Sequence, residues 1–327
     1  MPIRTIIGAK AARESVLKRR PLNLTRVSPA LQQSLQRLFG KGATPETAVR
    51  HILHDVREHG DRAIVEWTAK IDGIELGDLE VSPKKLKSMA DKADPKLRKS
   101  MELAANRISD FYSQWKRSLK ERLQFDELGV RWNPLNRVGV YAPGGTAVYP
   151  STVMMTAIPA REAGVRNVFL STPPSKDGSI SQTLALAAVV AGVDRVFNIG
   201  GAQAIGAMAY GTESVPGVDK ICGPGNIFVT LAKKEVYGDV GIDALNGPTE
   251  TVVLADDSAN PALCAADLLA QAEHDVLASP ILITDSLALA KKSDAGTGEA
   301  IGHARKGRHR QAGHRWAGRN RCRARYE

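Results

Sequence analysis

The sequence predicts an α/β fold built on a parallel, doubly wound sheet. Between residues 137 and 284, short runs of β-branched residues alternate with alanine-rich helical stretches, and this order is typical of parallel sheets. Gly-rich turns follow several expected strands, where such sheets carry their ligand loops. An apolar content of 43% and a charged content of 24% are those of a globular protein with a core.

Amphipathic helices are expected before the sheet. The apolar spacing predicts two or three helices over residues 28–71, one of them capped by Thr44 with Pro45 at its first position. Another long helix is predicted over residues 94–118. The sheet strands are expected at residues 138–141, 167–170, 195–199, 218–221, 251–254 and 281–284, and the helices between them at 151–163, 180–191, 202–211 and 225–236.

The positive charge is concentrated at the C-terminal end. The 327-residue chain has a formal net charge of +10, and residues 301–327 contribute +8 of it. Residues 293–327 are rich in Gly, Arg and His and lose all periodicity, so we expect a basic, disordered tail. Such a tail can bind phosphate non-specifically. Because no nucleic-acid motif is present and aromatic residues are few, we predict no nucleic-acid partner.

Cysteine usage and hydropathy predict a cytoplasmic protein without a membrane partner. Cys222, Cys264 and Cys322 are far apart and form no CxxC pair, so neither a disulfide framework nor a cysteine zinc site is expected. No apolar run reaches the roughly 18–20 residues needed to cross a bilayer. The first residues lack the apolar segment of a secretory signal.

Three Gly-rich turns form the first candidate ligand site. They span residues 140–145, 199–206 and 221–228. Tyr141, Gln203 and Asn226 lie in them, one in each turn. Glycine permits close ligand approach, and a helix N-terminus offers free N–H groups to an anion. A simple strand-to-helix connection explains any one turn better, and only the three turns at successive strand ends together weigh equally for a ligand site. None of the turns is a true GxGxxG motif.

The segment Gln271-Ala-Glu-His274 is a candidate metal motif. Gln271 and His274 are three residues apart, which places them on one face of a helix. Imidazole is a good zinc ligand, whereas a Gln carbonyl oxygen is an unusual one. Spacing alone favours a packed or capping histidine over a ligand. In the N-terminal region, His51, His54 and His59 have the spacing of solvated residues on a helix surface.

Taken together, these motifs resemble the histidinol dehydrogenase family. The resemblance runs through RVGVYAPGGTAVYPSTVMMTAIPAREAGV (137–165), IGGAQAIGAMAYGT (199–212), ICGPGNIFVT (221–230), NGPTETVVLAD (246–256) and DLLAQAEHD (267–275), and covers roughly residues 25–291. It implies a homodimeric enzyme that oxidises L-histidinol to L-histidine through the aldehyde, in the last two steps of histidine biosynthesis. It also implies two NAD-dependent hydride transfers and one zinc ion per site.

The resemblance assigns expected roles to particular residues. Tyr141, Gln203 and Asn226 match positions that contact NAD in the family. Thr249 falls at a substrate-contact position, where the family usually has Ser. Gln271 and His274 match two zinc ligands that also approach the substrate, so they are expected to serve both metal and substrate.

The resemblance also implies two Rossmann-like domains, one of them discontinuous. We expect residues 1–27 to be an N-terminal extension and residues 141–250 to be the NAD-binding domain. Residues 28–140 and 251–292 are expected to form the discontinuous α/β domain, incomplete in this chain. Residues 293–327 are the basic tail and lie outside the resemblance.

The sequence departs from the family pattern near its C-terminal end. The family's acid–base Glu-His pair, its other zinc ligands and a second substrate-binding Glu are expected beyond about residue 300, where nothing matches. Loss of a general base alone costs roughly 10²–10⁴ in rate. We hypothesise a C-terminal truncation caused by a shift of reading frame near residue 292. The alternatives are a zinc- and NAD-dependent dehydrogenase of another small alcohol, or an inactive fragment.

Overall fold

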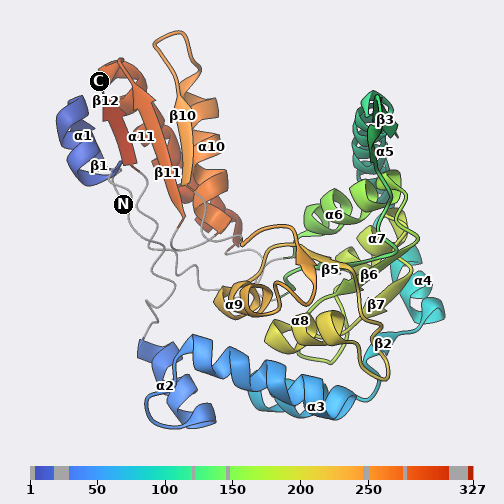
Figure 1. Cartoon of the computed structure of the whole chain (residues 1–327). Coiled ribbons are helices and arrows are strands. Elements are labelled where there is room, and N and C mark those ends of the chain that lie inside the picture. Colours follow the sequence, from blue (N-terminus) through green and yellow to red (C-terminus); the bar gives the residue numbers. More distant parts are fainter. Residues whose placement is uncertain are drawn as a thin grey trace. The chain divides into compact units, whose positions relative to one another are not determined.

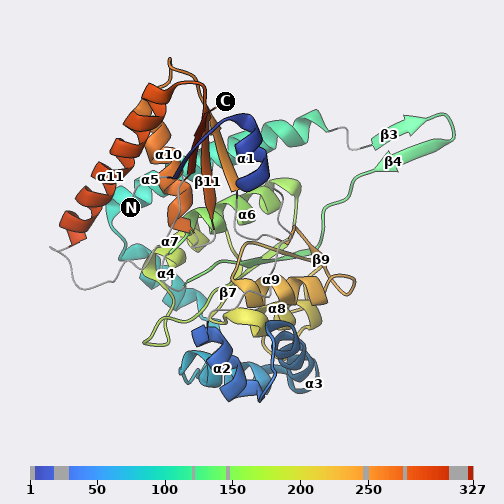
Figure 2. The same cartoon turned by 90° about the vertical axis from the view of Figure 1, so that its left-hand side faces the viewer.

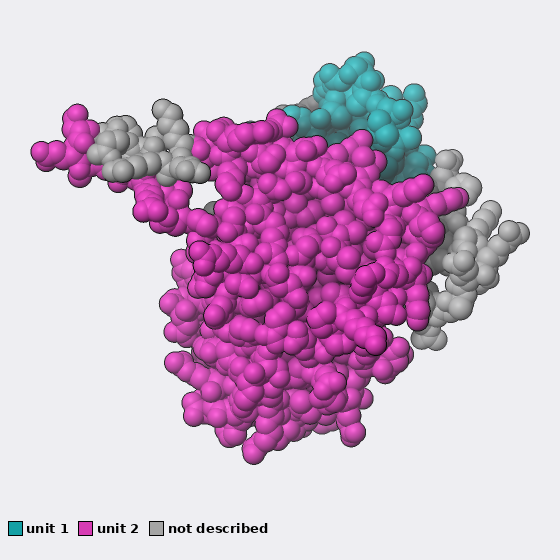
Figure 3. Space-filling model, turned by 90° about the vertical axis from the view of Figure 1, so that its right-hand side faces the viewer, with its two compact units in different colours: residues 1–23, 248–327 teal, residues 24–247 magenta. Residues whose placement is uncertain are grey.

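The computed structural model describes residues 4–17, 29–119, 122–144, 148–245, 250–274, 278–308 and 323–326. It divides into two compact units, coloured separately in Figure 3: residues 24–247, and residues 1–23 together with 248–327. In this division residues 28–140 belong with the central sheet rather than with residues 251–292. The discontinuous domain that the resemblance implies stays a prediction.

The larger unit is built on a six-stranded sheet (Figure 1). In spatial order its strands are β2 (Glu80–Val81), β7 (Arg195–Phe197), β6 (Asn167–Ser171), β5 (Arg137–Tyr141), β8 (Lys220–Cys222) and β9 (Gly241–Ile242). Strands β5 to β9 are all parallel, and the short edge strand β2 runs antiparallel to β7. The predicted α/β fold with a parallel sheet is therefore confirmed.

The chain reverses its direction of travel across this sheet after β7. Helices α6 (Pro150–Ala163) and α7 (Gln182–Val190) lead from β5 through β6 to β7. Helix α8 (Gly201–Tyr210) then leads to β8 on the other side of β5, and α9 (Ile227–Glu235) leads on to β9. Right-handed crossovers in opposite directions place helices on opposite faces of a sheet. Each face accordingly carries its own apolar core.

The N-terminal helices complete these two layers. Helix α2 (Pro29–Phe39) is followed by α3 (Pro45–Asp72), which packs on α8 and α9. On the other face, α4 (Pro83–Asp91) packs on α7 and α5 (Pro95–Ser118) on α6. The predicted start of α3 is confirmed, because Thr44 and Thr47 form a reciprocal capping box and Pro45 follows the cap.

Helix α3 is interrupted at Gly60, which has φ +54° and ψ −132°. The carboxylate of Glu213 fills the space beside it and accepts a hydrogen bond from the Asp61 N–H at 2.9 Å. The Asp61 carboxylate in turn accepts hydrogen bonds from the hydroxyls of Thr212 and Ser214. The loop after α8 is thereby fixed to the break in α3.

A two-stranded hairpin, β3 (Arg122–Phe125) and β4 (Leu128–Arg131), follows α5 and projects from the unit (Figure 2). The end of α5 exposes a group of aromatic side chains. Phe111 and Trp115 are 62% and 53% exposed, and their rings contact each other edge to face. Exposed aromatic groups of this kind are typical of surfaces that meet a partner.

The smaller unit contains a parallel sheet of four strands. In spatial order they are β1 (Arg4–Ile7), β12 (Arg323–Tyr326), β11 (Ser279–Thr284) and β10 (Glu250–Leu254). Its helices are α1 (Ala9–Ser15), α10 (Pro261–His274) and α11 (Leu287–Arg308). The small core of this unit lies between the sheet and α10 and α11, and contains Cys264, Leu268, Leu282 and Ala290.

The structure differs from the expected disorder beyond residue 292. Helix α11 continues to Arg308, and residues 323–326 form β12. Small residues explain the helix, because Ala290, Ser293 and Thr297 recur at helical spacing and are buried. Gly296 lies against α10, where a Cβ would be 3.2 Å from the Ala265 Cβ. The remaining tail residues, 309–322 and 327, lie outside the described residues.

In the described part of the chain, no helix combines the length and the apolar content that a membrane span requires.

Gly206 provides a test of the α3–α8 packing. A Cβ at Gly206 would lie 3.1 Å from Leu53 Cδ2 and 3.3 Å from Val56 Cγ1. We expect Gly206→Val to lower the free energy of unfolding by about 1–3 kcal/mol through overpacking, measured by urea denaturation. Gly77→Val is the control, because a Cβ at Gly77 meets no atom within 4 Å, and it should change stability by less than about 0.5 kcal/mol. Equal losses in the two variants would show that the helices do not depend on close contact here.

Candidate functional site

The three Gly-rich turns lie at the carboxyl ends of parallel strands in the larger unit. Tyr141 ends β5, the Gly201 turn follows β7, and the Gly223 turn follows β8. Because the connections leave β5 and β8 in opposite directions, the carboxyl ends of these two strands are the position at which open α/β sheets bind ligands in a crevice. The expected nucleotide residues are thus brought to the edge of the sheet where such ligands bind.

Tyr141 joins the three turns to one another. Its side chain is only 2% exposed, and its hydroxyl accepts a hydrogen bond from the Gly201 N–H at 3.2 Å. Its carbonyl oxygen occupies the space that a Cβ at Gly223 would need, and Gly223 has φ +116°. Only glycine therefore fits at Gly223. Burial raises the pKa of the Tyr141 hydroxyl well above its ordinary value, so the phenol stays protonated.

Gln203 is completely buried in the first turn of α8. Its Nε2 lies 3.5 Å from Thr68 Oγ1, and its Oε1 has no hydrogen-bond partner among the described residues. Turning the amide over would only exchange the two atoms, so one polar atom stays unsatisfied in either orientation. A buried polar atom without a partner costs stability, and such an atom beside a ligand turn indicates a group that binds something else.

The N-termini of α8 and α9 differ in how their N–H groups are used. Gly200 precedes α8 and no side chain caps that helix. Asn226 caps α9, and its Oδ1 accepts hydrogen bonds from the N–H groups of Phe228 and Val229 at 3.0 and 3.1 Å. The start of α8 is therefore the better anion site of the two. At Asn226 the amide nitrogen is the group left for a ligand.

Lys233 and Asp243 both contact the backbone of Gly223, and no sequence motif identifies them as a pair. Lys233 is 2% exposed and forms an ion pair with Asp243. Cys222, which precedes the turn, is half-buried, and burial, followed by the negative charge of Asp243, raises the pKa of its thiol to about 11. A thiol with so high a pKa is a poor nucleophile at neutral pH. The Cys222 thiol is therefore not expected to act as a nucleophile.

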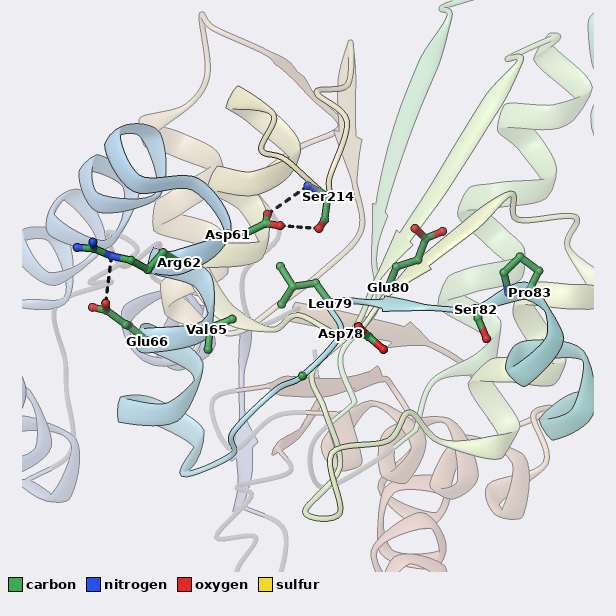
Figure 4. Close-up of a pocket in the computed structure, with 11 residues that line it drawn as sticks. Asp61, Arg62, Val65, Glu66, Asp78, Leu79, Glu80, Ser82, Pro83 and Ser214 are labelled. Carbon is green, nitrogen blue, oxygen red and sulfur yellow. Dashed lines mark hydrogen bonds and ion pairs between the residues drawn. The ribbon is translucent and has the colours of Figure 1, made fainter.

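A separate pocket of about 670 Å³ lies beside the edge strand β2 (Figure 4). It is lined by α3, residues 77–83 and Ser214. Most of its charged groups already have partners: Asp61 binds Ser214, Arg62 pairs with Glu66, and Glu80 pairs with Arg195. None of the expected nucleotide residues lines this pocket.

The candidate metal motif lies in the smaller unit. Helix α10 contains both Gln271 and His274, which confirms their helical spacing. The Oε1 of Gln271 accepts a hydrogen bond from the Thr251 hydroxyl at 2.8 Å. The His274 side chain and the whole of Thr249 lie outside the described residues.

The described residues do not by themselves fit a zinc ion. Gln271 offers one neutral oxygen, which already has a partner. Structural and catalytic zinc sites use three or four nitrogen, sulfur or carboxylate ligands. Among the described residues, no three His, Cys, Asp or Glu side chains gather into a possible metal site. His51, His54 and His59 are exposed on α3, as their spacing predicts.

Comparisons with known proteins converge on one family. The histidinol dehydrogenase family model matches residues 39–318. A histidinol dehydrogenase from Dehalococcoides mccartyi is 52% identical over 251 residues, which are 77% of this chain and 58% of that protein. One from Deinococcus radiodurans is 49% identical over 261 residues, which are 80% of this chain and 59% of that protein.

A solved structure also matches. The crystal structure of histidinol dehydrogenase from Elizabethkingia anophelis aligns with a TM-score of 0.82 and 30% sequence identity, over 99% of this chain and 71% of that chain. The chain thus spans less than three fifths of the length of the two curated relatives described above. The family match runs to residue 318 and so includes most of the segment that the sequence alone sets apart.

Gln203 allows stability and ligand binding to be separated. We expect Gln203→Met, which has a similar volume, to raise the free energy of unfolding by about 1 kcal/mol, because it removes an unsatisfied buried polar group. If Gln203 contacts NAD, as the resemblance implies, the same change should weaken NAD binding. Urea denaturation and calorimetric titration measure the two quantities. A large loss of stability would instead mean that the amide serves the fold.

Proposed function

This chain belongs to the histidinol dehydrogenase family, and we propose that it binds NAD and serves the oxidation of L-histidinol to L-histidine through the aldehyde. The meeting of the three Gly-rich turns at the carboxyl ends of β5, β7 and β8 is the observation that carries the proposal, because these turns hold Tyr141, Gln203 and Asn226. We further propose that the protein is a cytoplasmic oxidoreductase of histidine biosynthesis and that its partner is a second copy of the chain.

NAD+, when bound, would supply the hydride acceptor, one molecule for the alcohol carbon and a second, after NADH has left, for the carbon of the hydrated aldehyde. The residues of this chain would hold and orient the nucleotide. The uncapped N-terminus of α8 suits the negative charge of the pyrophosphate. The Asn226 amide nitrogen and the unsatisfied amide of Gln203 are the hydrogen-bonding groups available to the rest of the nucleotide. Tyr141 would act indirectly, because its buried hydroxyl fixes the Gly201 turn.

Gln271 and His274 are the only zinc ligands that we propose in this chain, and Thr249 is proposed as a contact for the substrate. No step of the proposal depends on the metal, because the described donors do not fit a zinc ion on their own. The exposed Phe111 and Trp115 support a protein partner for this chain. Nucleotide binding is the part of the function that the described side chains support most directly.

The first experiment measures nucleotide binding and turnover together. We expect the purified chain to bind NAD at one site per chain in a calorimetric titration. NADH formation with L-histidinol, followed by absorbance, should be slow, because no Glu-His pair matches the family in this sequence and a missing general base lowers the rate by about 10²–10⁴. Ethanol is the control alcohol. Absence of NAD binding would contradict the proposal.

Asn226 tests the assignment of the nucleotide site. Asn226→Asp keeps the oxygen that caps α9, so the free energy of unfolding should change by less than about 0.5 kcal/mol. It removes the amide donor and adds a negative charge at the site expected to bind the anionic nucleotide, so the Kd for NAD should rise about 10-fold or more. Asn226→Ser is the matched variant, because it retains a capping oxygen without the charge. Unchanged NAD affinity in both variants would exclude Asn226 from the site.

A further inference from the structure

Lys233 is a buried cation in the last turn of the amphipathic helix α9. Its side chain is 2% exposed, although α9 has solvent-facing positions on its other side. The partner is Asp243, which directly follows β9. Removing a lysine and a carboxylate from water is costly, and a well-packed apolar pair often serves a core as well or better. The ion pair therefore indicates a local requirement beyond core packing.

Both members of the pair also bind the backbone of Gly223. The Lys233 ammonium donates a hydrogen bond to the Gly223 carbonyl oxygen at 2.9 Å. The Gly223 N–H donates a hydrogen bond to Asp243 Oδ2 at 2.8 Å. The two backbone polar groups of one residue are thus held by the two opposite charges. Gly223 has φ +116° and lies directly against the Tyr141 carbonyl, so the pair fixes the turn in a conformation that only glycine readily adopts.

The fixed turn ends at Asn226. On the helix side, the Asn226 oxygen is held by the N–H groups of Phe228 and Val229. On the strand side, the chain is held at Gly223 by Lys233 and Asp243. Since Lys233 lies two turns along the same helix, the pair ties the start of α9 to the ends of β8 and β9. The position of the Asn226 amide nitrogen follows from these two attachments.

We propose that Lys233 and Asp243 are a positioning pair for the nucleotide site. They hold residues 223–226 so that the Asn226 amide donor points into the crevice beside Tyr141. The pair does not itself attract the nucleotide, because the Lys233 charge is buried and neutralised by Asp243. This inference rests on the proposed function, and it identifies two residues that position the same site without contacting the nucleotide.

The test compares two variants of the full chain, each of which removes one cation that binds backbone carbonyls at the end of a strand. Lys233→Met removes the ammonium and keeps most of the apolar stem. Arg161→Met is the matched control, because Arg161 pairs with Asp194 and donates hydrogen bonds to the carbonyls of Val165 and Gly192. Those residues directly precede β6 and β7, and so lie at the amino ends of the strands, away from the Gly-rich turns at the carboxyl ends. Both variants are expected to melt at a lower temperature than the wild-type chain.

Only Lys233→Met should lose nucleotide affinity. We expect its Kd for NAD, measured calorimetrically well below both melting temperatures, to rise about 10-fold or more, since small displacements of a binding group have effects of this size. Arg161→Met should stay within about 2-fold of the wild-type chain. In Lys233→Met, amide hydrogen exchange at Phe228 and Val229 should also accelerate. If Lys233→Met does not fold, Asp243→Asn replaces it, because it keeps the volume and removes one charge.

The outcomes separate this inference from the function on which it rests. If the wild-type chain does not bind NAD, the proposed function fails, and the positioning role fails with it. If the wild-type chain binds NAD and Lys233→Met (or Asp243→Asn) binds it as tightly as Arg161→Met does, the positioning role alone is overturned. If affinity falls only in the Lys233 or Asp243 variant, the positioning role is supported.

Discussion

The close contact between Gly223 and the Tyr141 carbonyl is the constraint on which the larger unit depends. Strands β5 and β8 are neighbours in the sheet, but they are separated by two complete strand–helix units in the chain. The polypeptide must therefore return to β5 after β7 and leave β8 in the opposite direction. A side chain at Gly223 would push the two strand ends apart. The two cores, the crevice and the placement of α8 and α9 all follow from this one junction.

The polar groups at the carboxyl ends of β5, β7 and β8 differ in whether they have hydrogen-bond partners within the protein. The Asn226 oxygen, the Gly223 backbone and the Tyr141 hydroxyl all have partners within the protein. The Oε1 of Gln203 lacks a partner among the described residues, although the side chain is fully buried. A fold selected only for stability would place an apolar side chain there. The contrast indicates that the rigid groups shape the crevice, while the unsatisfied amide is kept for a bound molecule.

Much of the two parallel sheets could be predicted from the sequence, because each long strand is a short apolar run that contains β-branched residues. The expected β5, β6, β10 and β11 agree with the structure to within two residues at each end. Strands β2 and β9 contain two residues each, too few for any periodicity. Strand β12 contains two arginines in four residues, so it has no apolar run that would distinguish it from the rest of the basic tail.

The candidate site divides in the same way. Glycines mark the turns that hold Tyr141, Gln203 and Asn226, so these positions could be identified without coordinates. Lys233 and Asp243 could not be identified from the sequence, because a lysine in an amphipathic helix is expected to face solvent. Only the geometry shows that Lys233 meets Asp243. The roles of Thr249, Gln271 and His274 stay predictions.

The break in α3 at Gly60 has a consequence for how relatives of this chain vary. Glu213 lies in the space that a side chain at position 60 would occupy, and its carboxylate accepts a hydrogen bond from the next N–H of the helix. A relative with an uninterrupted helix here has no room for that carboxylate and no free N–H for it to bind. Positions 60 and 213 should therefore covary across an alignment, although 152 residues separate Asp61 from Glu213.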